Sequence, residues 1–430
     1  MFLPGLRERT PRWRGAKGLL PGGACPIVAG KGMFMALFDG LKVIDCATYI
    51  AGPTAATVLA EFGADVVKIE PPGGDPYRTR ATTPASGYVH PRSPNFVLDG
   101  RARKSLILDL RQEAGRSVLR RLVAEADVFI TNAPPDVRQK LGVTYDDLGP
   151  LNPRLIYASF TGYGEDGPEA SKPGFDATAW WARSGLMHLV RAGDAAPARS
   201  LAGMGDHPSG IALYAAVATA LFQRERTGKG LAVGSSLLAN GLWSNGCQVQ
   251  ARLCGETVAV QPAHDDSPHP LRNHYRCRDD KWLLLSIVPE QRRWEAFARV
   301  LDSPLLDDPR FATVDGRARN PKALTVALDA VFVTRDRAAW CVALEPTGLV
   351  FGIVATMEDM PDEQAVASGA LVRFADDTLL TVSSPFWVGG QRKVAPRHAS
   401  AAGADGASVL AAAGYAEAEI AALRAAGVTV

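Results

Sequence analysis

The sequence has no closely spaced cysteine pair, no cluster of basic residues and no long apolar run. Its six cysteines are scattered without a C-x-x-C spacing, which in a chain of 430 residues favours reduced thiols in a cytoplasmic protein. The formal net charge is only +2, so nothing indicates a nucleic-acid partner. The apolar runs are too short or too interrupted to cross a bilayer, and we therefore expect no membrane partner.

Several catalytic signatures are also missing. No G-x-S-x-G elbow is present, so the sequence does not support an α/β-hydrolase. The turn Ala51-Gly52-Pro53 lacks the glycine pair of a dinucleotide-binding fold. Residues 162–167 match G-x-G-x-x-G, but Pro168 and a poor helical sequence follow, so that no helix begins there. A nicotinamide or flavin site is not expected.

Histidines and acidic residues are concentrated in one proline-rich stretch, which raises the question of a metal site. The residues concerned are His264, His269 and His274, with Asp265 and Asp266. Their spacing fits no standard ligand pattern, and prolines separate them. We interpret the stretch as a solvated loop and expect no metal.

The composition of the chain is that of a globular protein, with 47% hydrophobic and 21% charged residues. Residues 1–34 are different, because turn formers occur throughout and no hydrophobic period is sustained. We predict a disordered extension there, with ordered structure beginning at about residue 35.

Strands and helices are predicted to alternate in the first part of the chain, which indicates an α/β fold with a mostly parallel sheet covered on both faces. A further helix is expected from Asp206 to about Arg226, ending at a glycine-containing turn. The expected strands are 42–47, 65–70, 105–110, 127–132 and 155–160, with helices at 54–62 and 112–126.

A change in composition near residue 250 predicts a domain boundary. We expect a large domain whose N-terminal part spans 35–250, and a smaller α+β domain at 251–335 with a strand at 282–287 and a helix at 290–301. Residues 336–430 are expected to form a C-terminal part that returns to the large domain. Strands are predicted there at 349–354 and 379–382, and a helix at 416–426.

Asp206 lies in Gly203-Met-Gly-Asp-His-Pro208, at the predicted start of the long helix. One interpretation is an ordinary helix cap, with Pro208 in the first turn. The other is a nucleophilic carboxylate held by flexible glycines, beside helix amides that bind oxyanions. A second carboxylate, Asp176, follows Gly174-Phe175 and is either an Asx turn or part of a site. Trp180 and Trp181 are either core residues or a pocket wall.

Together these segments resemble the family III CoA-transferases, the group of formyl-CoA transferase and carnitine CoA-transferase that also contains α-methylacyl-CoA racemase. The resemblance covers roughly residues 37–430. It depends on six segments in register rather than on one motif. They are the AGP turn with LAEFGADVVKIEPPGGDPYR, then RKSLILDL, NPRLIYASFTGYGEDGP, PGFD, GDHPSG and ALFQRERTGKG.

The resemblance implies a Rossmann-like large domain that binds coenzyme A, with the smaller domain inserted into it. It also implies a homodimer of two interlocked rings. The catalytic carboxylate of the family falls on Asp206, where it attacks an acyl-CoA thioester and forms covalent aspartyl intermediates. The second acidic position of the active site falls on Asp176.

The coenzyme A contacts of the family also carry over to this sequence. Two of them, Arg111 and Lys140, are cations suited to the phosphates of coenzyme A, and Lys104 is a further candidate nearby. The complete set consists of Thr48, Tyr49, Ile50, Ala51, Lys104, Leu108, Arg111, Asn132 and Lys140.

Three departures from the family bear on the substrate and the reaction. Ile50 stands where formyl-CoA transferase has glutamine, and the Gly-Gly-Gly-Gly-Gln loop of that enzyme is missing from residues 255–285. Both make formate and oxalate poor substrate candidates, and Ile50 together with Trp180 and Trp181 favours a larger or more hydrophobic acyl group. Phe175 stands where the racemases have histidine, so CoA transfer is preferred over α-proton transfer by a racemase or isomerase. Asp206 itself argues against a catalytically inactive CoA-binding homologue.

Overall fold

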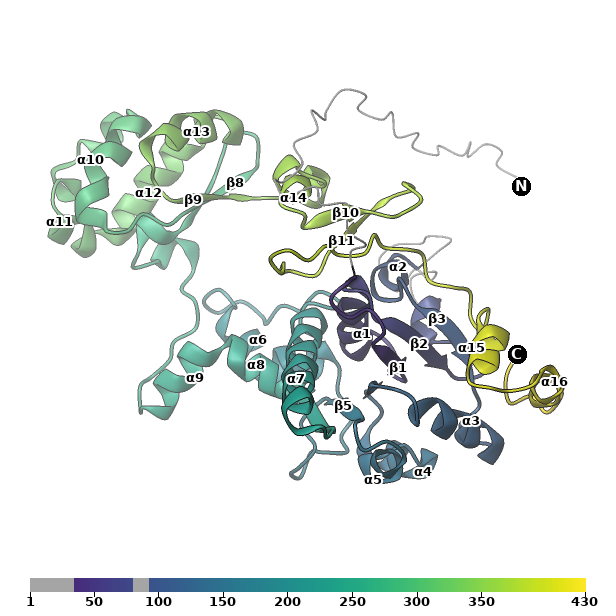
Figure 1. Ribbon diagram of the computed structural model, residues 1–430. Coiled ribbons are helices and arrows are strands. Elements are labelled where there is room, and N and C mark those ends of the chain that lie inside the picture. The colour runs from purple at the N-terminus through teal and green to yellow at the C-terminus, as the bar shows by residue number, and fades with distance from the viewer. Residues whose placement is uncertain (1–34, 80–92) are drawn as a thin grey trace, which may run out of the picture.

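The large sheet in the computed structural model has six parallel strands in the order β3-β2-β1-β4-β5-β6 (Figure 1). The structure describes residues 35–79 and 93–430, and the extension predicted at 1–34 lies outside this range. The order reverses between β1 and β4, which is the switch point of a doubly wound fold. The strands are β1 (Lys42–Asp45), β2 (Asp65–Glu70), β3 (Lys104–Ile107), β4 (Val128–Thr131), β5 (Ile156–Thr161) and β6 (Leu231–Ser236).

Helices cover both faces of this sheet, as its alternating side chains require. On one face, Val43 and Val128 pack with α1 (Ala51–Glu61) and α7 (Asp206–Thr227). On the other face, the neighbouring Ile44 and Phe129 pack with α3 (Glu113–Val123), α15 (Gly406–Ala412) and α16 (Glu417–Ala425). Two hydrophobic cores therefore enclose the sheet, and the predicted α/β class is confirmed.

The predicted elements of this part occur, with shifted ends. The first helix begins at Ala51 rather than at residue 54 because Pro53 fits the first turn of a helix. The strand predicted at 105–110 ends at Ile107. Its continuation leaves the sheet because the Asp109 amide donates to the Val428 carbonyl and the Asp109 side chain accepts from the Arg111 amide.

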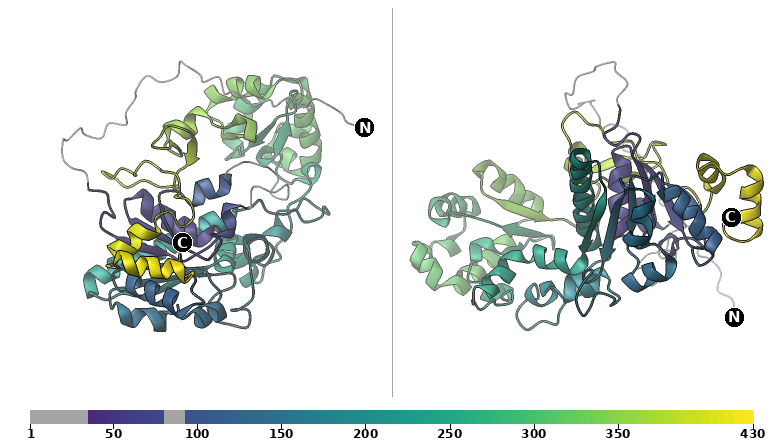
Figure 2. Two further views of the ribbon diagram at one scale, coloured as in Figure 1. Left: turned by 90° about the vertical axis from the view of Figure 1, so that its right-hand side faces the viewer. Right: turned by 60° about the horizontal axis from the view of Figure 1, so that its bottom comes forward.

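A third hydrophobic core lies apart from the large sheet, on the side opposite the C-terminal helices (Figure 2). It packs helices against an antiparallel sheet in the order β7-β8-β9. The range 251–335 predicted for the small domain stops short of this core. Trp340 is fully buried in it, and β9 pairs with β8, so the packed unit continues to Val354. Its elements include β7 (His274–Arg276), β8 (Trp282–Leu285), α10 (Glu290–Leu301), α11 (Val314–Arg319), α12 (Pro321–Phe332), α13 (Arg337–Leu344) and β9 (Phe351–Val354).

After β9 the chain returns to the large sheet. A hairpin of β10 (Leu371–Arg373) and β11 (Leu380–Val382) comes first, and the Val394 amide then donates to the Glu61 carbonyl at 2.7 Å. The Gly403 amide donates to Ser105 Oγ at 2.8 Å before α15 begins. Shorter or peripheral helices are α2 (Pro94–Asp99), α4 (Pro135–Leu141), α5 (Tyr145–Leu148), α6 (Leu186–Leu189), α8 (Leu237–Ser244), α9 (Gly246–Leu253) and α14 (Glu363–Ala367).

Two general properties complete the description of the fold. Within residues 35–79 and 93–430, none of the helices combines the length and the hydrophobicity that a membrane crossing requires. The five cysteines of these residues are all free thiols. The division of the chain into domains remains a prediction.

Candidate active site

The turn between β1 and α1 lies at the switch point of the sheet and contains four of the predicted coenzyme A contacts. Asn132, which follows β4, fixes this turn through both of its amide atoms. Its Oδ1 accepts from the Thr48 amide at 2.9 Å, and its Nδ2 donates to the Thr48 carbonyl at 2.7 Å. Tyr49 has a positive φ of 63°, a conformation that costs free energy and is retained mainly where the surroundings enforce it. The structure thus brings Thr48, Tyr49, Ile50, Ala51 and Asn132 together.

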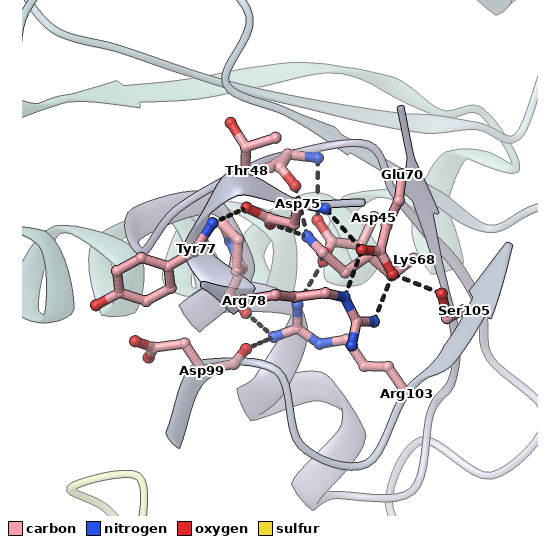
Figure 3. A network of polar contacts seen from close by, with 12 residues as sticks. Asp45, Thr48, Lys68, Glu70, Asp75, Tyr77, Arg78, Asp99, Arg103 and Ser105 are labelled. Carbon is pink, nitrogen blue, oxygen red and sulfur yellow. Dashed lines mark hydrogen bonds and ion pairs between the residues drawn. The ribbon is translucent and has the colours of Figure 1, made fainter. Parts of the chain in front are cut away.

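A buried polar network supports the same turn from below (Figure 3). Lys68 Nζ donates to the Ala47 carbonyl at 2.7 Å and forms an ion pair with Asp75 at 2.9 Å. Asp45 accepts from the Ala47 amide at 3.1 Å and pairs with Arg103. Because a buried lysine needs such partners, this arrangement holds the turn rigidly. Sequence reasoning did not find the network, and the signal was Lys68 between the apolar residues Val67 and Ile69 of a buried strand.

Asp206 is the first residue of α7, and the residue at the capping position is Gly205. Asp206 forms no capping hydrogen bond, so the interpretation as an ordinary helix cap is not supported. In the described part of the chain, no group donates a hydrogen bond to its carboxylate, which is partly exposed. In the first turn, the amides of His207 and Ser209 already donate to the carbonyls of Gly203 and Gly205. The carboxylate of Asp206 is therefore available for reaction at the positive end of the helix dipole.

Asp176 connects its own loop to the loop that precedes Asp206. Its Oδ2 accepts from the Gly203 amide at 2.9 Å, and its Oδ1 accepts from the Ala177 amide at 2.6 Å. The second bond reaches the next residue and not the one after it, so this contact is not that of an Asx turn, which was one of the two interpretations of Asp176. Gly203 has a φ of +78°, which favours glycine at this position. The two predicted catalytic carboxylates are therefore neighbours.

The electrostatic surroundings keep Asp206 close to its titration point. Burial is the largest effect, and it acts together with the nearby carboxylates of Asp176 and Asp99 to raise the pKa of Asp206 to about 7. The neighbouring His207 opposes this effect and favours the ionised form. A carboxylate that titrates near neutral pH is frequent at functional sites.

His207 forms a pair with Asp99, a residue that the sequence did not indicate because it lies 108 positions away. The ring nitrogen Nε2 is 3.0 Å from Asp99 Oδ1, and Nδ1 is 3.0 Å from the Gly203 carbonyl oxygen. Burial alone would lower the pKa of His207. The hydrogen bond and charge of Asp99 outweigh this effect and raise it.

Apolar side chains surround the loop of residues 203–206. A side chain at Gly203 would lie 3.5 Å from Ile50 Cδ1, so Ile50 packs against this loop. A side chain at Gly205 would lie 2.6 Å from the ring of Trp180. Trp180 and Trp181 are both buried and stack on each other in the core of the large sheet. They are core residues, and Trp180 supports the loop before Asp206.

The remaining coenzyme A candidates lie in different places. Leu108 is buried just after β3, and Arg111 follows it with an exposed side chain that pairs with Asp109 at 2.8 Å. Lys140 is exposed on α4, after β4, and lies 3.5 Å from Asp136. These three lie beyond the carboxyl ends of strands, where ligands of such sheets bind. Lys104 is the first residue of β3 and therefore lies at the amino end of the strand, where it pairs with Asp65. The structure does not bring it to the other candidates.

The histidine-rich stretch contains a group of possible metal ligands that includes a residue not predicted from the sequence. Ligand atoms of His264, Asp265 and Asp329 lie within 4.8 Å of one another. His264 Nε2 is already 3.0 Å from both carboxylate oxygens of Asp329. Asp266, in contrast, pairs with Lys322 at 3.0 Å, so the stretch is not gathered around one point.

The fold and the paired carboxylates agree with the comparison to known protein families. The model of CoA-transferase family III matches residues 38–406, which is most of the chain. The chain belongs to this family and is a CoA-transferase.

Individual relatives support the same assignment. The chain is 32% identical over 344 residues to the (R)-2-hydroxy-4-methylpentanoate CoA-transferase of Clostridioides difficile, covering 80% of this chain and 86% of that protein. It is 33% identical over 321 residues to the acetyl-CoA:oxalate CoA-transferase of Acetobacter aceti, covering 73% and 80%. The crystal structure of a CAIB/BAIF family protein from Brucella suis matches with a TM-score of 0.78 at 28% identity. It covers 88% of this chain and 100% of that one.

Proposed function

We propose that the protein transfers coenzyme A from an acyl-CoA thioester to a carboxylic acid through covalent intermediates on Asp206. The observation that carries the proposal is the carboxylate of Asp206 at the start of α7, which accepts no hydrogen bond within the described residues. It lies beside the turn of residues 48–51, because Ile50 packs on Gly203 and α1 packs on α7 at Gly210. A reactive oxygen and the proposed coenzyme A site are thus adjacent.

The reaction follows from carboxylate chemistry in balanced steps. Asp206 attacks the thioester carbonyl, the carbon–sulfur bond breaks, and coenzyme A leaves as a thiolate with a mixed anhydride remaining. The thiolate then attacks the Asp206 carbonyl carbon, which releases the donor acid and forms an aspartyl-CoA thioester. An acceptor carboxylate repeats these steps in reverse. Each exchange replaces one difficult substitution by two easier ones.

The carboxylate pair and the first turn of α7 suit this chemistry. The dipole of a helix favours negative charge at its N-terminus, and such charge develops on the carbonyl oxygen of each tetrahedral intermediate. We propose that Asp176 holds the loop before Asp206 through the Gly203 amide, at 2.9 Å. Thr48, Tyr49, Ile50, Ala51, Leu108, Arg111, Asn132 and Lys140 are proposed to hold coenzyme A.

The covalent intermediate is tested by incubating the enzyme with an acyl-CoA and measuring its intact mass, with and without hydroxylamine. The wild-type enzyme should gain the mass of an acyl or CoA adduct, and hydroxylamine should convert the adduct to an aspartyl hydroxamate at residue 206. Asp206→Asn should lose both the adduct and turnover, whereas the exposed Asp194→Asn should retain both. An adduct on the Asp206→Asn enzyme would refute the proposal.

Racemisation is not favoured. Phe175 precedes Asp176 with 59% of its surface exposed, and its side chain cannot exchange a proton. The test is made in deuterium oxide: solvent deuterium at the α-carbon without acyl exchange would indicate a racemase.

For the acyl group, we propose a branched or otherwise hydrophobic acid. One relative acts on a branched 2-hydroxy acid and another on oxalate, according to their names. Ile50 favours the first, because it is buried against the catalytic loop in an apolar cluster with Tyr77 and Phe96 and offers no hydrogen bond to a second carboxylate. Competition between 2-hydroxy-4-methylpentanoate and oxalate as acceptors should favour the former at least tenfold. Ile50→Gln should reduce this preference, and a wild-type preference for oxalate would contradict it.

We further propose an interlocked homodimer in the cytoplasm. Large apolar side chains are exposed on the single chain, including Trp243 at 87% and Trp387 at 85%, and such surfaces often mark subunit contacts. Light scattering coupled to size-exclusion chromatography should give twice the chain mass of 45.7 kDa. A monomer would refute this assembly.

A further inference from the structure

Both ring nitrogens of His207 face oxygen atoms. Nδ1 lies 3.0 Å from the carbonyl oxygen of Gly203, which can only accept a hydrogen bond. Nε2 lies 3.0 Å from Oδ1 of Asp99, which accepts when the carboxyl group is ionised. A neutral imidazole has one donor and one acceptor, so two donors at these distances require the doubly protonated ring.

The surroundings of Asp99 keep the shared proton on the histidine. Arg103 is a second buried cation in the neighbourhood of Asp99, and its positive charge favours a carboxylate there. Imidazole is also the more basic of the two partners by about 2.6 pKa units in water. The pair is therefore an imidazolium with a carboxylate, and the raised pKa of His207 agrees with this state.

This cation lies next to Asp206 in the chain. The charges facing Asp206 are the carboxylates of Asp176 and Asp99, which disfavour its ionised form, and the ring of His207, which favours it. The same ring binds the Gly203 carbonyl, while Asp176 binds the Gly203 amide. Asp176 and His207 thus bind the backbone amide and the backbone carbonyl of Gly203, which lies three positions before Asp206.

We propose that His207, kept as an imidazolium by Asp99, is a positioning residue that fixes the loop of residues 203–206 and supplies a positive charge that favours the ionised, reactive form of Asp206. This role depends on the proposed function of Asp206 as the nucleophile. His207 itself does not contact the acyl group in this scheme. It acts through the charge and the position of its neighbour.

The first test compares the pH dependence of kcat/KM for acyl-CoA between the wild-type enzyme and His207→Gln. Glutamine retains a donor but carries no charge, so Asp206 should ionise at higher pH. The acidic limb should move upward by about one unit, which corresponds to about a tenfold loss at low pH. The loss should diminish at alkaline pH. A loss of equal size at every pH, with an unmoved limb, would show a merely structural role. His188→Gln, on the exposed surface of α6, is the matched control.

The second test does not depend on activity. Wild-type protein carrying ¹⁵N-histidine is observed by NMR at pH 7.5, and the signal of His207 is identified by its loss in His207→Gln. Both ring nitrogens should show the shifts of protonated imidazolium, whereas one bare nitrogen would overturn the proposal. Failure of Asp206 as the nucleophile would be a different result. The Asp206→Asn enzyme would then form an adduct, while the NMR signature of His207 would stay unchanged.

Discussion

The carboxylate of Asp176 accepts a hydrogen bond from the backbone amide of Gly203 at 2.9 Å. This bond joins two loops that are 27 residues apart in the chain, and it brings two carboxylates into one site. Like charges at short distance oppose ionisation, so the arrangement that positions Asp206 also raises its pKa. The predictions below use this relationship and the packing around it.

Replacing Asp176 by asparagine should move the acidic limb of the pH–activity profile downward. Asparagine still accepts the Gly203 amide through its oxygen but removes one negative charge beside Asp206. The pKa of Asp206, about 7 in the wild type, should therefore fall. The measurement is kcat/KM from pH 5 to 9, and the shift should have the opposite sign to that of His207→Gln. A limb that moves upward would contradict the electrostatic account.

Asp206→Asn should stabilise the protein at alkaline pH. The folded pKa of about 7 lies above the value of about 3.9 for an unfolded aspartate, so the native state binds the proton more tightly. The contribution of this group to the free energy of unfolding therefore decreases as pH rises from about 4 to 7. Asparagine removes this dependence. The Tm of the variant should exceed that of the wild type by a few degrees at pH 8, with a smaller difference at pH 5. An equal Tm difference at both pH values would argue against a raised pKa.

Gly205→Ala should disturb the active site through Trp180. The added carbon would lie 2.6 Å from the indole ring, which is buried and cannot move away freely. We expect a loss of about 1–3 kcal/mol in stability and a large decrease in kcat, because Asp206 follows directly. Urea denaturation and steady-state kinetics measure the two effects. Gly246→Ala, where nothing lies within 4 Å of the added carbon, is the control and should change neither.

Arg78→Ala should destabilise the protein most at neutral pH. Glu70 is fully buried and pairs with Arg78 through both carboxylate oxygens. Burial would raise the pKa of Glu70, but hydrogen bonds from Arg78, Ser105 and the Asp75 amide outweigh this and lower it. The pair therefore stabilises the fold above the ordinary carboxyl pKa, and this contribution is lost as pH falls.

Removing the arginine leaves a buried charge at neutral pH, which costs about 3–5 kcal/mol. Urea denaturation at pH 7 and pH 4 measures the effect, which should be smaller at pH 4. The exposed pair of Arg276 and Asp280 provides the control, because Arg276→Ala should change stability little. If Arg78→Ala lost more stability at pH 4 than at pH 7, Glu70 would be excluded as the source of the loss.

Much of the fold could be predicted from local pattern. The buried strand 65–70 lies between Gly63 and Pro71, and the helix from Asp206 has Pro208 in its first turn and Gly228 at its end. Because these end signals are local, both elements occur where they were expected. The third core extends beyond residue 335, because Trp340 and β9 join it through contacts distant in sequence. Composition near the boundary carries no information about such pairing.

The candidate site also has parts that the sequence could predict and parts that it could not. Gly203-Met-Gly-Asp206 could be recognised as a motif because its residues are adjacent, and so could the turn of residues 48–51. The partners that decide their chemistry are distant. Asp99 is paired with His207 across 108 residues, and Asn132 with Thr48 across 84. Lys104 is close to Leu108 in sequence, but the two residues lie at opposite ends of β3. The strand begins at Lys104 and ends at Ile107, directly before Leu108.

The amino-acid sequence by itself determined the α/β class, the family and the carboxylate that we propose as nucleophile, because these depend on periodicity and on motifs that are contiguous. Only the tertiary structure decided the state of that carboxylate. Burial, the carboxylates of Asp176 and Asp99 and the adjacent His207 set its pKa, and both acids come from segments far from Asp206 in the chain. Electrostatic energies depend on distance and on solvent exposure, and both exist only after the chain has folded.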